Sequence, residues 1–260
     1  GIDNLYLYKD EGEMLKAFLD IIQDADVLSG WNSEGYDIPY VINRIQKVLS
    51  KDDTRKLCLW KQLPKKRVFE RFGREQETYD LVGRVHLDSL ELYRKYTYEE
   101  RHSYRLDAIG EHELGEKKTV YEGSLDQLYN QDFRTFVEYN RQDVNLIDKL
   151  DRKLKFIALT NELAHANTVL LQTTLGAVAV TEQAIINEAH RRGVQVPNRP
   201  KRDSDSTTAA GAYVAFPKKG LHDWIGSMDI NSLYPSVIRA LNMAPECVMG
   251  QLRPSHTAVS

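Results

Sequence analysis

Three aspartates spread along the sequence lie in contexts that suit metal-dependent phosphoryl chemistry. Asp37 stands between an apolar run and a helical pattern, Asp143 follows Tyr139 by about one helical turn, and Asp229 ends a second apolar run. Carboxylate oxygens are the ligands that hard cations such as Mg²⁺ prefer. Pairs of such cations promote phosphodiester hydrolysis and phosphoryl transfer. The three aspartates therefore direct attention to chemistry on phosphate esters.

The first aspartate ends the run from Gly30 to Asp37, which we expect to join a strand to a helix. Tyr36 and Tyr40 flank Asp37, and aromatic rings in such a place can stack on nucleobases. Asp37 can ligate a hard cation there. An N-cap for the following helix also explains Asp37, and for this residue considered alone the cap is the better explanation.

The other two aspartates have different alternatives. Tyr139 and Asp143 share a helix face, where a carboxylate beside a phenol can hold a metal ion and orient a bound water. Considered alone, an ordinary Tyr–Asp pair on an exposed face explains this spacing better. Asp229 precedes a turn and a helix near Pro235, so it can present Mg²⁺ to a triphosphate whose oxygens the turn N–H groups bind. An aspartate that only caps the turn is here the weaker explanation, because the run to Ser236 is unusual.

The elements that must position these residues follow from apolar periodicity, which predicts a mixed α/β or α+β fold. The expected strands cover 5–8, 27–32, a hairpin over 68–85 that turns at 72–75, the start of 85–93, 212–216 and 225–230. The expected helices cover 11–26, 39–48, the end of 85–93, 104–111, 125–132, 133–163, 173–192 and 234–241. The polar, proline-containing stretch 196–208 predicts a linker or loop.

Composition and charge narrow the class of protein. Hydrophobic residues make up 42% and charged residues 28%, which is typical of a globular chain and argues against disorder. The net charge of −3 argues mildly against non-specific nucleic-acid binding, and the basic stretch from Lys61 to Arg74 alone indicates only a solvated face. Cys58 and Cys247 lack a CxxC spacing, which favours reduced thiols in a cytoplasmic protein. No apolar run approaches the roughly 20 residues that span a bilayer, so no membrane partner is expected.

Taken together and in this order, the motifs resemble those of family B DNA polymerases, especially the replicative polymerases of T-even-like bacteriophages. Asn32–Asp37 is similar to the second exonuclease motif, Tyr139–Asp143 to the third, and Asp229–Ser236 to polymerase motif A. Gly211–Val214 stands where the family has a short glycine-containing motif, and Tyr104–Ile109 resembles another family segment. The resemblance covers nearly the whole chain.

For the exonuclease motifs, the resemblance implies 3′→5′ proofreading at the single-stranded 3′ end of DNA. Asp37 and Asp143 would bind two divalent cations, Mg²⁺ or Mn²⁺, and Tyr139 would orient the attacking water. Asn32 and Tyr36 would contact the DNA.

For the hairpin and motif A, the resemblance implies contacts with primer-template DNA and with the incoming dNTP. The segment Arg71–Gly83 resembles the hairpin that helps to separate primer from template, so Arg71 and Arg74 would face DNA. Asp229 would ligate Mg²⁺ at the polymerase site. The nucleotide-binding residues would be Ser232, Leu233 and Tyr234, the last of them under the sugar.

The resemblance also implies three regions. Residues 1–155 would form a 3′→5′ exonuclease domain with an RNase H-like core, from which the N-terminal strands would be missing. Residues 156–197 would form a helical connector similar to the family's N-terminal domain. Residues 198–260 would begin the polymerase palm.

Two features depart from the family pattern. An Asp-x-Glu motif on an early strand is absent. The run Glu11-Gly12-Glu13 is no substitute for it, because we expect that run in a turn before a helix. No Asp-Thr-Asp motif follows motif A, and the superficially similar run Asp203–Ser206 precedes it in a polar stretch. We therefore expect a fragment of a replicative DNA-directed DNA polymerase, with incomplete metal sites and with weak activity or none by itself.

The same departures leave room for different functions. The chain could be a non-catalytic DNA-binding or assembly module, or one half of a split polymerase whose second polypeptide supplies the missing strands. A free-standing exonuclease is a third alternative, against which motif A argues. Missing strands would leave an exposed sheet edge, from which we predict self-association.

Overall fold

The chain divides into two units, Gly1–Arg199 and Pro200–Ser260. The computed structural model describes residues 5–71, 74–115, 124–198, 211–247 and 249–250. The expected linker, 196–208, spans the division between the units, and its residues from 199 onward, including Asp203–Ser206, lie outside the described part.

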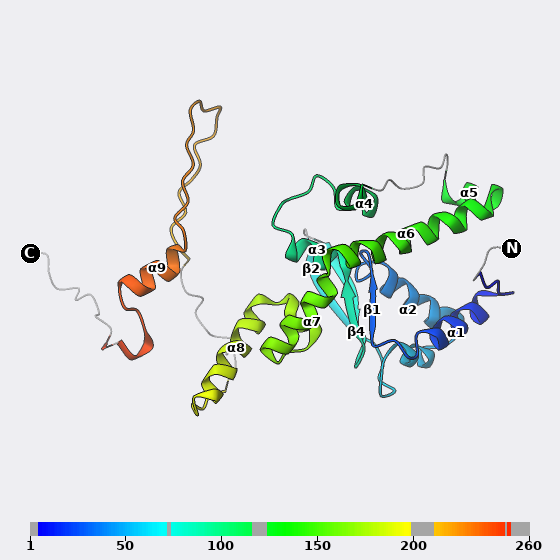
Figure 1. Ribbon diagram of the computed structural model, residues 1–260, viewed down its shortest axis with the longest axis horizontal. Coiled ribbons are helices and arrows are strands. Elements are labelled where there is room, and N and C mark those ends of the chain that lie inside the picture. The colour runs from blue at the N-terminus through cyan, green and yellow to red at the C-terminus, as the bar shows by residue number, and fades with distance from the viewer. Residues whose placement is uncertain (1–4, 72–73, 116–123, 199–210, 248, 251–260) are drawn as a thin grey trace, which may run out of the picture. The chain divides into compact units, whose positions relative to one another are not determined.

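A short parallel sheet lies at the centre of the first unit (Figure 1). Strand β1 (Val27–Gly30) pairs with β4 (Val85–Asp88), in a register that sets Gly30 opposite Asp88. Parallel strands need a long crossover connection, and here it contains helix α2 (Asp37–Val48), a 3₁₀ turn (Asp52–Leu57) and a β-hairpin. The carboxyl ends of both strands therefore meet at one edge, where the chain leaves β1 toward α2.

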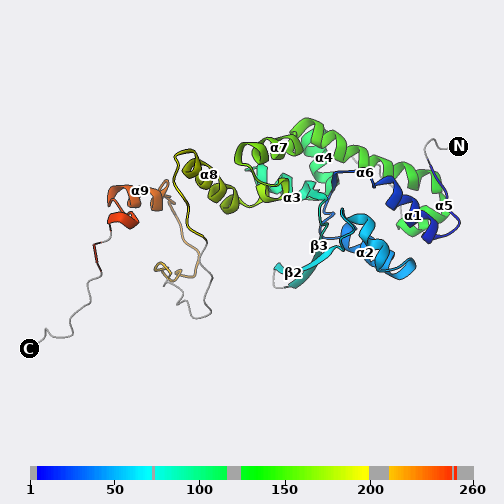
Figure 2. The same ribbon diagram turned by 90° about the horizontal axis from the view of Figure 1, so that it is seen from below.

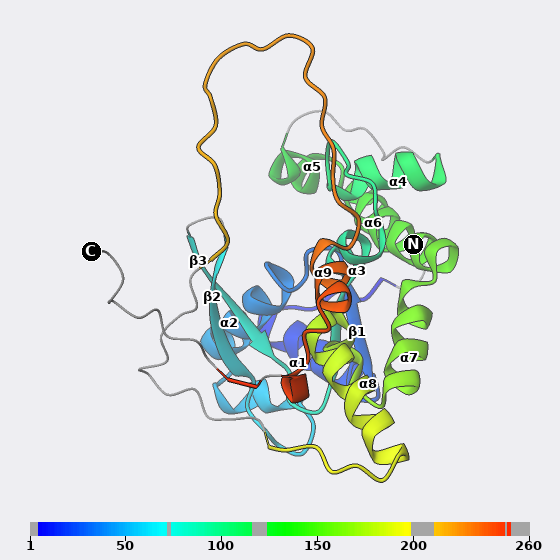
Figure 3. The same cartoon turned by 90° about the vertical axis from the view of Figure 1, so that its left-hand side faces the viewer.

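The predicted hairpin is confirmed. Strand β2 (Lys65–Arg71) pairs antiparallel with β3 (Arg74–Asp80), and Figure 3 shows both strands alongside α2. The register runs from Lys65 opposite Asp80 to Arg71 opposite Arg74. Phe72 and Gly73, where the turn was expected, lie outside the described residues.

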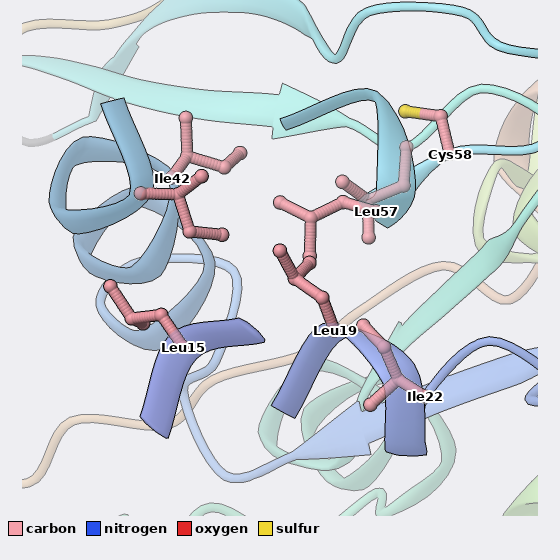
Figure 4. Packing of buried hydrophobic residues seen from close by; sticks show 8 residues of the cluster. Leu15, Leu19, Ile22, Ile42, Leu57 and Cys58 are labelled. Carbon is pink, nitrogen blue, oxygen red and sulfur yellow. The ribbon is translucent and has the colours of Figure 1, made fainter. Parts of the chain in front are cut away.

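The main hydrophobic core joins α1 (Glu11–Ile21), α2, the 3₁₀ turn that follows α2, and Leu81 after the hairpin (Figure 4). Asp10 caps α1, because its Oδ1 accepts from the Glu13 amide at 2.9 Å. Ile42 and Ile45 are fully buried on the inner face of α2, and burial of one such side chain contributes about 1.5–3 kcal/mol. This anchorage fixes the helix that begins with Asp37. The buried members of the core are Leu15, Leu19, Ile22, Ile42, Ile45, Leu57, Cys58 and Leu81.

Helices α4 and α5 pack against the long helix α6 (Phe133–Leu154), and a second core is formed by Tyr93, Ile109 and Leu150, whereas α8 packs against α7. Figures 1 and 2 show α4 and α5 alongside α6. The other elements are α3 (Ser89–Tyr96), α4 (Leu106–Leu114), α5 (Leu125–Gln131), α7 (Phe156–Asn167), a 3₁₀ turn (Leu171–Leu175) and α8 (Ala177–Arg191).

Three expectations for the first unit need correction. The single helix expected over 133–163 is two helices, because Lys155 adopts a left-handed conformation (φ 57°) that ends α6 before α7 begins. The helix expected over 11–26 ends at Ile21. Residues 5–8 form no strand, because they pair with no other strand in the part of the chain that the structure describes.

The second unit contains helix α9 (Leu233–Ala240) and a 3₁₀ turn (Pro245–Cys247) within its described residues, 211–247 and 249–250. The strands expected over 212–216 and 225–230 are not formed. Apolar alternation makes a strand only where a neighbouring strand completes its hydrogen bonds, and these segments pair with none among the described residues. Their apolar side chains are exposed, as Phe216 (96%) and Met228 (99%) illustrate.

Candidate metal-binding and nucleic-acid site

The loop between β1 and α2 is the best-defined candidate site of the first unit. It begins after Gly30 and turns at Asn32, whose φ of 59° lies in the left-handed region. The Tyr36 amide donates to the Asn32 carbonyl at 3.1 Å, and the Ile38 amide donates to the Ser33 carbonyl at 3.0 Å. The loop therefore winds directly into α2, of which Asp37 is the first residue.

Asp88, the last residue of β4, anchors the backbone of this loop. Asp88 is 3% exposed, and its two oxygens accept from the amides of Asn32 (2.9 Å), Glu34 (3.0 Å) and Leu90 (2.9 Å). Burial raises the pKa of Asp88, although the three amide donors act in the opposite direction. A buried carboxylate with several amide partners fixes the backbone that supplies them.

Other contacts close the same loop against the strands. His86 lies two residues before Asp88, on the same face of β4, and its Nε2 is 2.9 Å from the Ser33 hydroxyl. Burial lowers the pKa of His86, while the charge of Asp88 raises it. Gly30 allows the close approach, because a Cβ there would lie 2.8 Å from the Cβ of Ser33.

Asp37 directly follows this fixed loop. The residue as a whole is exposed, yet partial burial of its carboxyl group raises its pKa, and the nearby charge of Asp88 adds to the rise. A cation bound at Asp37 would offset the repulsion between this carboxylate and the charge of Asp88. The donor chemistry at Asp37 therefore fits a hard divalent cation.

The aromatic residues beside Asp37 are arranged as a stacked pair. The rings of Tyr36 and Tyr40 are parallel to within 11°, with centroids 5.8 Å apart. Both residues are exposed, at 63% and 54%. Flat exposed rings next to a carboxylate can stack on nucleobases. Asn32, the other DNA-contact residue that the resemblance implies, is exposed at the other end of the same loop.

The hairpin is tied to this loop through Glu34. Arg67 of β2 donates from Nη2 to Glu34 Oε1 at 2.7 Å, and the Thr78 hydroxyl of β3 donates to the Glu34 carbonyl at 3.2 Å. Arg71 and Arg74 pair with each other at the far end of the hairpin. Their side chains lie outside the described part of the structure.

Tyr139 and Asp143 lie one turn apart on α6, and both are half-buried. The helix is fixed near its C-terminal end by Glu113 of α4, which accepts from the Tyr93 hydroxyl (2.8 Å) and from Lys153 (3.2 Å). Within the described residues, no three His, Cys, Asp or Glu side chains gather into a group that could hold a metal ion. The structure thus brings Asp37 beside Asp88, and Tyr139 beside Asp143, without a complete two-metal ligand set.

Motif A lies in the second unit. Asp229 is exposed and precedes Ser232, whose φ of 52° is left-handed. The Ser236 amide donates to the Ser232 carbonyl at 2.9 Å, so the turn starts α9 at Leu233. Leu233 and Tyr234 are exposed, at 46% and 70%. Asp229 follows a segment that forms neither helix nor strand, which corrects the expected strand-end position.

Motif reasoning missed Asp88, His86 and Glu34. A signal for Asp88 was present, because this aspartate ends an expected strand immediately before an expected helix, as Asp229 was also expected to do. Two of the three amide donors of Asp88, those of Asn32 and Glu34, lie more than fifty positions earlier, which no local pattern encodes.

Comparison with known proteins gives the class of the chain. A family model described as DNA polymerase family B, exonuclease domain, matches residues 1–109, and one described as DNA polymerase family B matches residues 168–259. The chain belongs to DNA polymerase family B.

Individual members of the family are similar to nearly the whole chain. It is 29% identical over 257 residues to the DNA-directed DNA polymerase of Escherichia phage RB69, and 26% identical over 257 residues to that of Enterobacteria phage T4. Each match covers 97% of this chain and 28% of the relative. The bovine DNA polymerase delta catalytic subunit is 31% identical over 263 residues, with 95% of this chain and 23% of the relative covered. The chain therefore spans about 28% of the length of these phage relatives.

Among the described residues, no helix is both long enough and apolar enough to cross a membrane.

Proposed function

We propose that the chain contributes the 3′→5′ proofreading exonuclease and the first part of the polymerase palm to a replicative DNA-directed DNA polymerase. The observation that carries this proposal is the exposed Asp37 at the start of α2, directly after a loop that Asp88 fixes at the carboxyl edge of the β1–β4 pair. We assign residues 1–155 to an RNase H-like exonuclease domain, 156–197 to a helical connector and 198–260 to the palm. An exonuclease-domain model that matches residues 1–109 and a family B model that matches residues 168–259 support the order of these regions but not their boundaries.

In this proposal, Asp37 and Asp143 hold divalent cations, Mg²⁺ or Mn²⁺. When bound, such cations activate water and stabilise charge on the scissile phosphate. Asp37 supplies an exposed carboxylate from the first residue of α2, and Asp143 supplies a half-buried carboxylate from α6. Since no group of three metal-binding side chains is present among the described residues, we expect weak hydrolysis or none by this chain alone.

The chain's own residues bind and orient the DNA. Tyr139 lies one turn before Asp143 on α6, where its hydroxyl can orient the attacking water. Tyr36 offers an exposed ring for the terminal base, supported from behind by the stacked ring of Tyr40. Base stacking on such a ring is worth about 1–3 kcal/mol. Asn32 contacts the same 3′ strand from the start of the loop.

The hairpin and motif A act on the duplex and the nucleotide. Arg71 and Arg74 face DNA at the far end of the hairpin. In the palm, Asp229 ligates Mg²⁺, and its nucleotide-binding neighbours are Ser232, Leu233 and Tyr234. Because these palm residues are exposed and no three metal-binding side chains form a group among the described residues, we expect no DNA synthesis by this chain alone.

The exonuclease role is tested with excess full chain, Mn²⁺ and a 5′-labelled single-stranded oligonucleotide. We expect slow, stepwise shortening from the 3′ end, or at least Mn²⁺-dependent binding that a 3′-phosphate weakens. Asp37→Ala and Asp143→Ala abolish both effects. Asp148→Asn is the matched control, because Asp148 is an exposed α6 carboxylate that pairs with Arg152 at 2.9 Å.

Two results decide the question. If the chain shows no shortening and no 3′-dependent binding at any Mn²⁺ concentration, the exonuclease proposal is contradicted. Fast degradation that Asp143→Ala abolishes supports the exonuclease and overturns our expectation of weak activity.

We further propose that the sheet edge formed by β1 and β4 recruits another chain, either a second copy or a separate polypeptide. Parallel sheets are rarely stable as isolated pairs of strands, and β1 and β4 pair only with each other among the described residues. Light scattering of the purified chain tests the second-copy arm, where a monomer at all concentrations excludes self-association. Co-purification with a polypeptide that carries Asp-x-Glu supports the split-polymerase alternative.

A further inference from the structure

Asp88 makes more contacts than a helix cap requires. Its Oδ1 accepts from the Leu90 amide at 2.9 Å, which is the ordinary N-cap bond of α3. The same oxygen accepts from the Asn32 amide at 2.9 Å, and Oδ2 accepts from the Glu34 amide at 3.0 Å. These partners lie 56 and 54 residues earlier in the chain. The two long-range bonds therefore serve the loop and not α3.

The loop depends on these bonds to keep its shape. Asn32 has a left-handed backbone (φ 59°), a conformation that costs a non-glycine residue free energy, although Asn tolerates it better than most. Opening the loop would also leave a buried carboxylate without two of its three donors, which is costly. Each contribution favours the one shape in which the amides of Asn32 and Glu34 converge on Asp88.

That shape sets the position of Asp37. The Tyr36 amide donates to the Asn32 carbonyl, and the Ile38 amide donates to the Ser33 carbonyl, so the clamped residues are bonded to the first turn of α2. Buried Ile42 and Ile45 hold the rest of α2 in the core. Asp37 thus stands between a clamped loop and an anchored helix.

Asp88 and Asp37 have different environments at this edge of the sheet. Asp88 is buried and its oxygens are occupied by amide donors, so it is poorly placed to ligate a cation. Asp37 is exposed and is the first residue of α2. An outer residue that orients a metal ligand without touching the metal is a common arrangement in proteins.

We propose that Asp88 is a positioning residue, which holds the Asn32–Asp37 loop in the shape that presents the Asp37 carboxylate to a divalent cation. This inference rests on the proposed function, since it concerns the same metal-binding carboxylate.

Two substitutions separate the loop contacts from the cap. Asp88→Ser keeps a good N-cap residue for α3, but one hydroxyl cannot reach both loop amides. Asp88→Asn is milder, because it keeps Oδ1 and replaces only the Oδ2 acceptor with an NH₂ group. Asp10→Asn is the matched control, since Asp10 caps α1 through one amide, that of Glu13.

The experiment uses the full ¹⁵N-labelled chain and Mn²⁺ as the probe. Amide hydrogen exchange at Asn32 and Glu34 reports the loop, and paramagnetic broadening of the amides beside Asp37 reports the cation. We expect faster exchange at both amides in Asp88→Ser, and at Glu34 in Asp88→Asn. The Mn²⁺ concentration for half-broadening should rise about tenfold in Asp88→Ser. Asp10→Asn should change neither quantity.

The reference variant Asp37→Asn separates the possible failures. If Asp37→Asn weakens Mn²⁺ binding and both Asp88 variants do not, Asp88 is only structural and the inference is overturned, while the proposed function stands. If exchange at Asn32 and Glu34 is unchanged in Asp88→Ser, the clamp itself is refuted. If Asp37→Asn leaves Mn²⁺ binding unchanged, the proposed metal role of Asp37 fails and the inference falls with it.

Discussion

Replacing Gly30 by alanine should loosen the loop that carries Asp37. The added Cβ would lie 2.8 Å from the Cβ of Ser33 and 3.1 Å from its Oγ, whereas ordinary contact begins at 3.4 Å. Ser33 is 4% exposed and its hydroxyl contacts His86, so it has little room to move by itself. The loop must therefore shift as a whole, by about 0.6 Å or more.

The size of the effect follows from that shift. A displacement of about 0.6 Å along the bond between the Glu34 amide and Asp88 would stretch it beyond useful length. A hydrogen bond to a charged group contributes about 1.5–3 kcal/mol, and alanine recovers about 0.5–1 kcal/mol over glycine in a strand. We expect a net loss of about 1–2 kcal/mol in the free energy of unfolding of the first unit.

Urea unfolding measures this loss. For a slope of about 2 kcal/mol per molar urea, the midpoint should fall by about 0.5–1 M. Gly226→Ala is the control, because Gly226 has no heavy atom within 4 Å of the added Cβ. An unchanged midpoint together with unchanged Mn²⁺ broadening beside Asp37 would refute the close packing of the loop on the strand end.

Three further predictions concern single side chains. Burial lowers the pKa of His86, so the folded unit binds fewer protons there than the unfolded chain, and stability should fall as pH drops below the ordinary histidine value of about 6.5; urea midpoints at pH 8, 6 and 5 should show a smaller fall in His86→Gln. Tyr93→Phe removes a buried hydroxyl that bonds to two side chains and should cost about 1–3 kcal/mol, whereas Tyr98→Phe, at a fully exposed position, should leave the midpoint unchanged. Burial raises the pKa of the Cys58 thiol, and Cys247 is exposed, so a thiol reagent at pH 8 should titrate one cysteine in the native chain and two in denaturant; two fast-reacting thiols in the native chain would contradict the burial of Cys58.

Sequence periodicity predicted the elements that have a strong local signal. The helix that begins near Asp37 and the β2–β3 hairpin are both formed. The break at Lys155 was missed, because apolar spacing continues on both sides and no glycine or proline marks it. The strands expected over 212–216 and 225–230 failed for a different reason, since a strand depends on a partner that its own sequence does not specify.

The candidate site was predictable only in part. Asp37, Tyr139 and Asp143 stand out because their neighbours form short motifs. Whether these motifs act as the resemblance implies stays a prediction. Asp88 could not be singled out as the clamp, because its decisive bonds join segments that only the β1–β4 register brings together.

The tie between Glu34 and the hairpin has a practical consequence for protein engineering. Glu34 is gripped by Arg67 and Thr78, which face each other in the hairpin register, closer to its base than to its far end. The part of the hairpin beyond this pair, toward Arg71 and Arg74, can be lengthened or shortened without changing the contacts of Glu34. A peptide tag or a fluorescent probe inserted between Arg71 and Arg74 would therefore report on molecules that bind near the far end of the hairpin. The loop before Asp37 would keep its contacts with the hairpin.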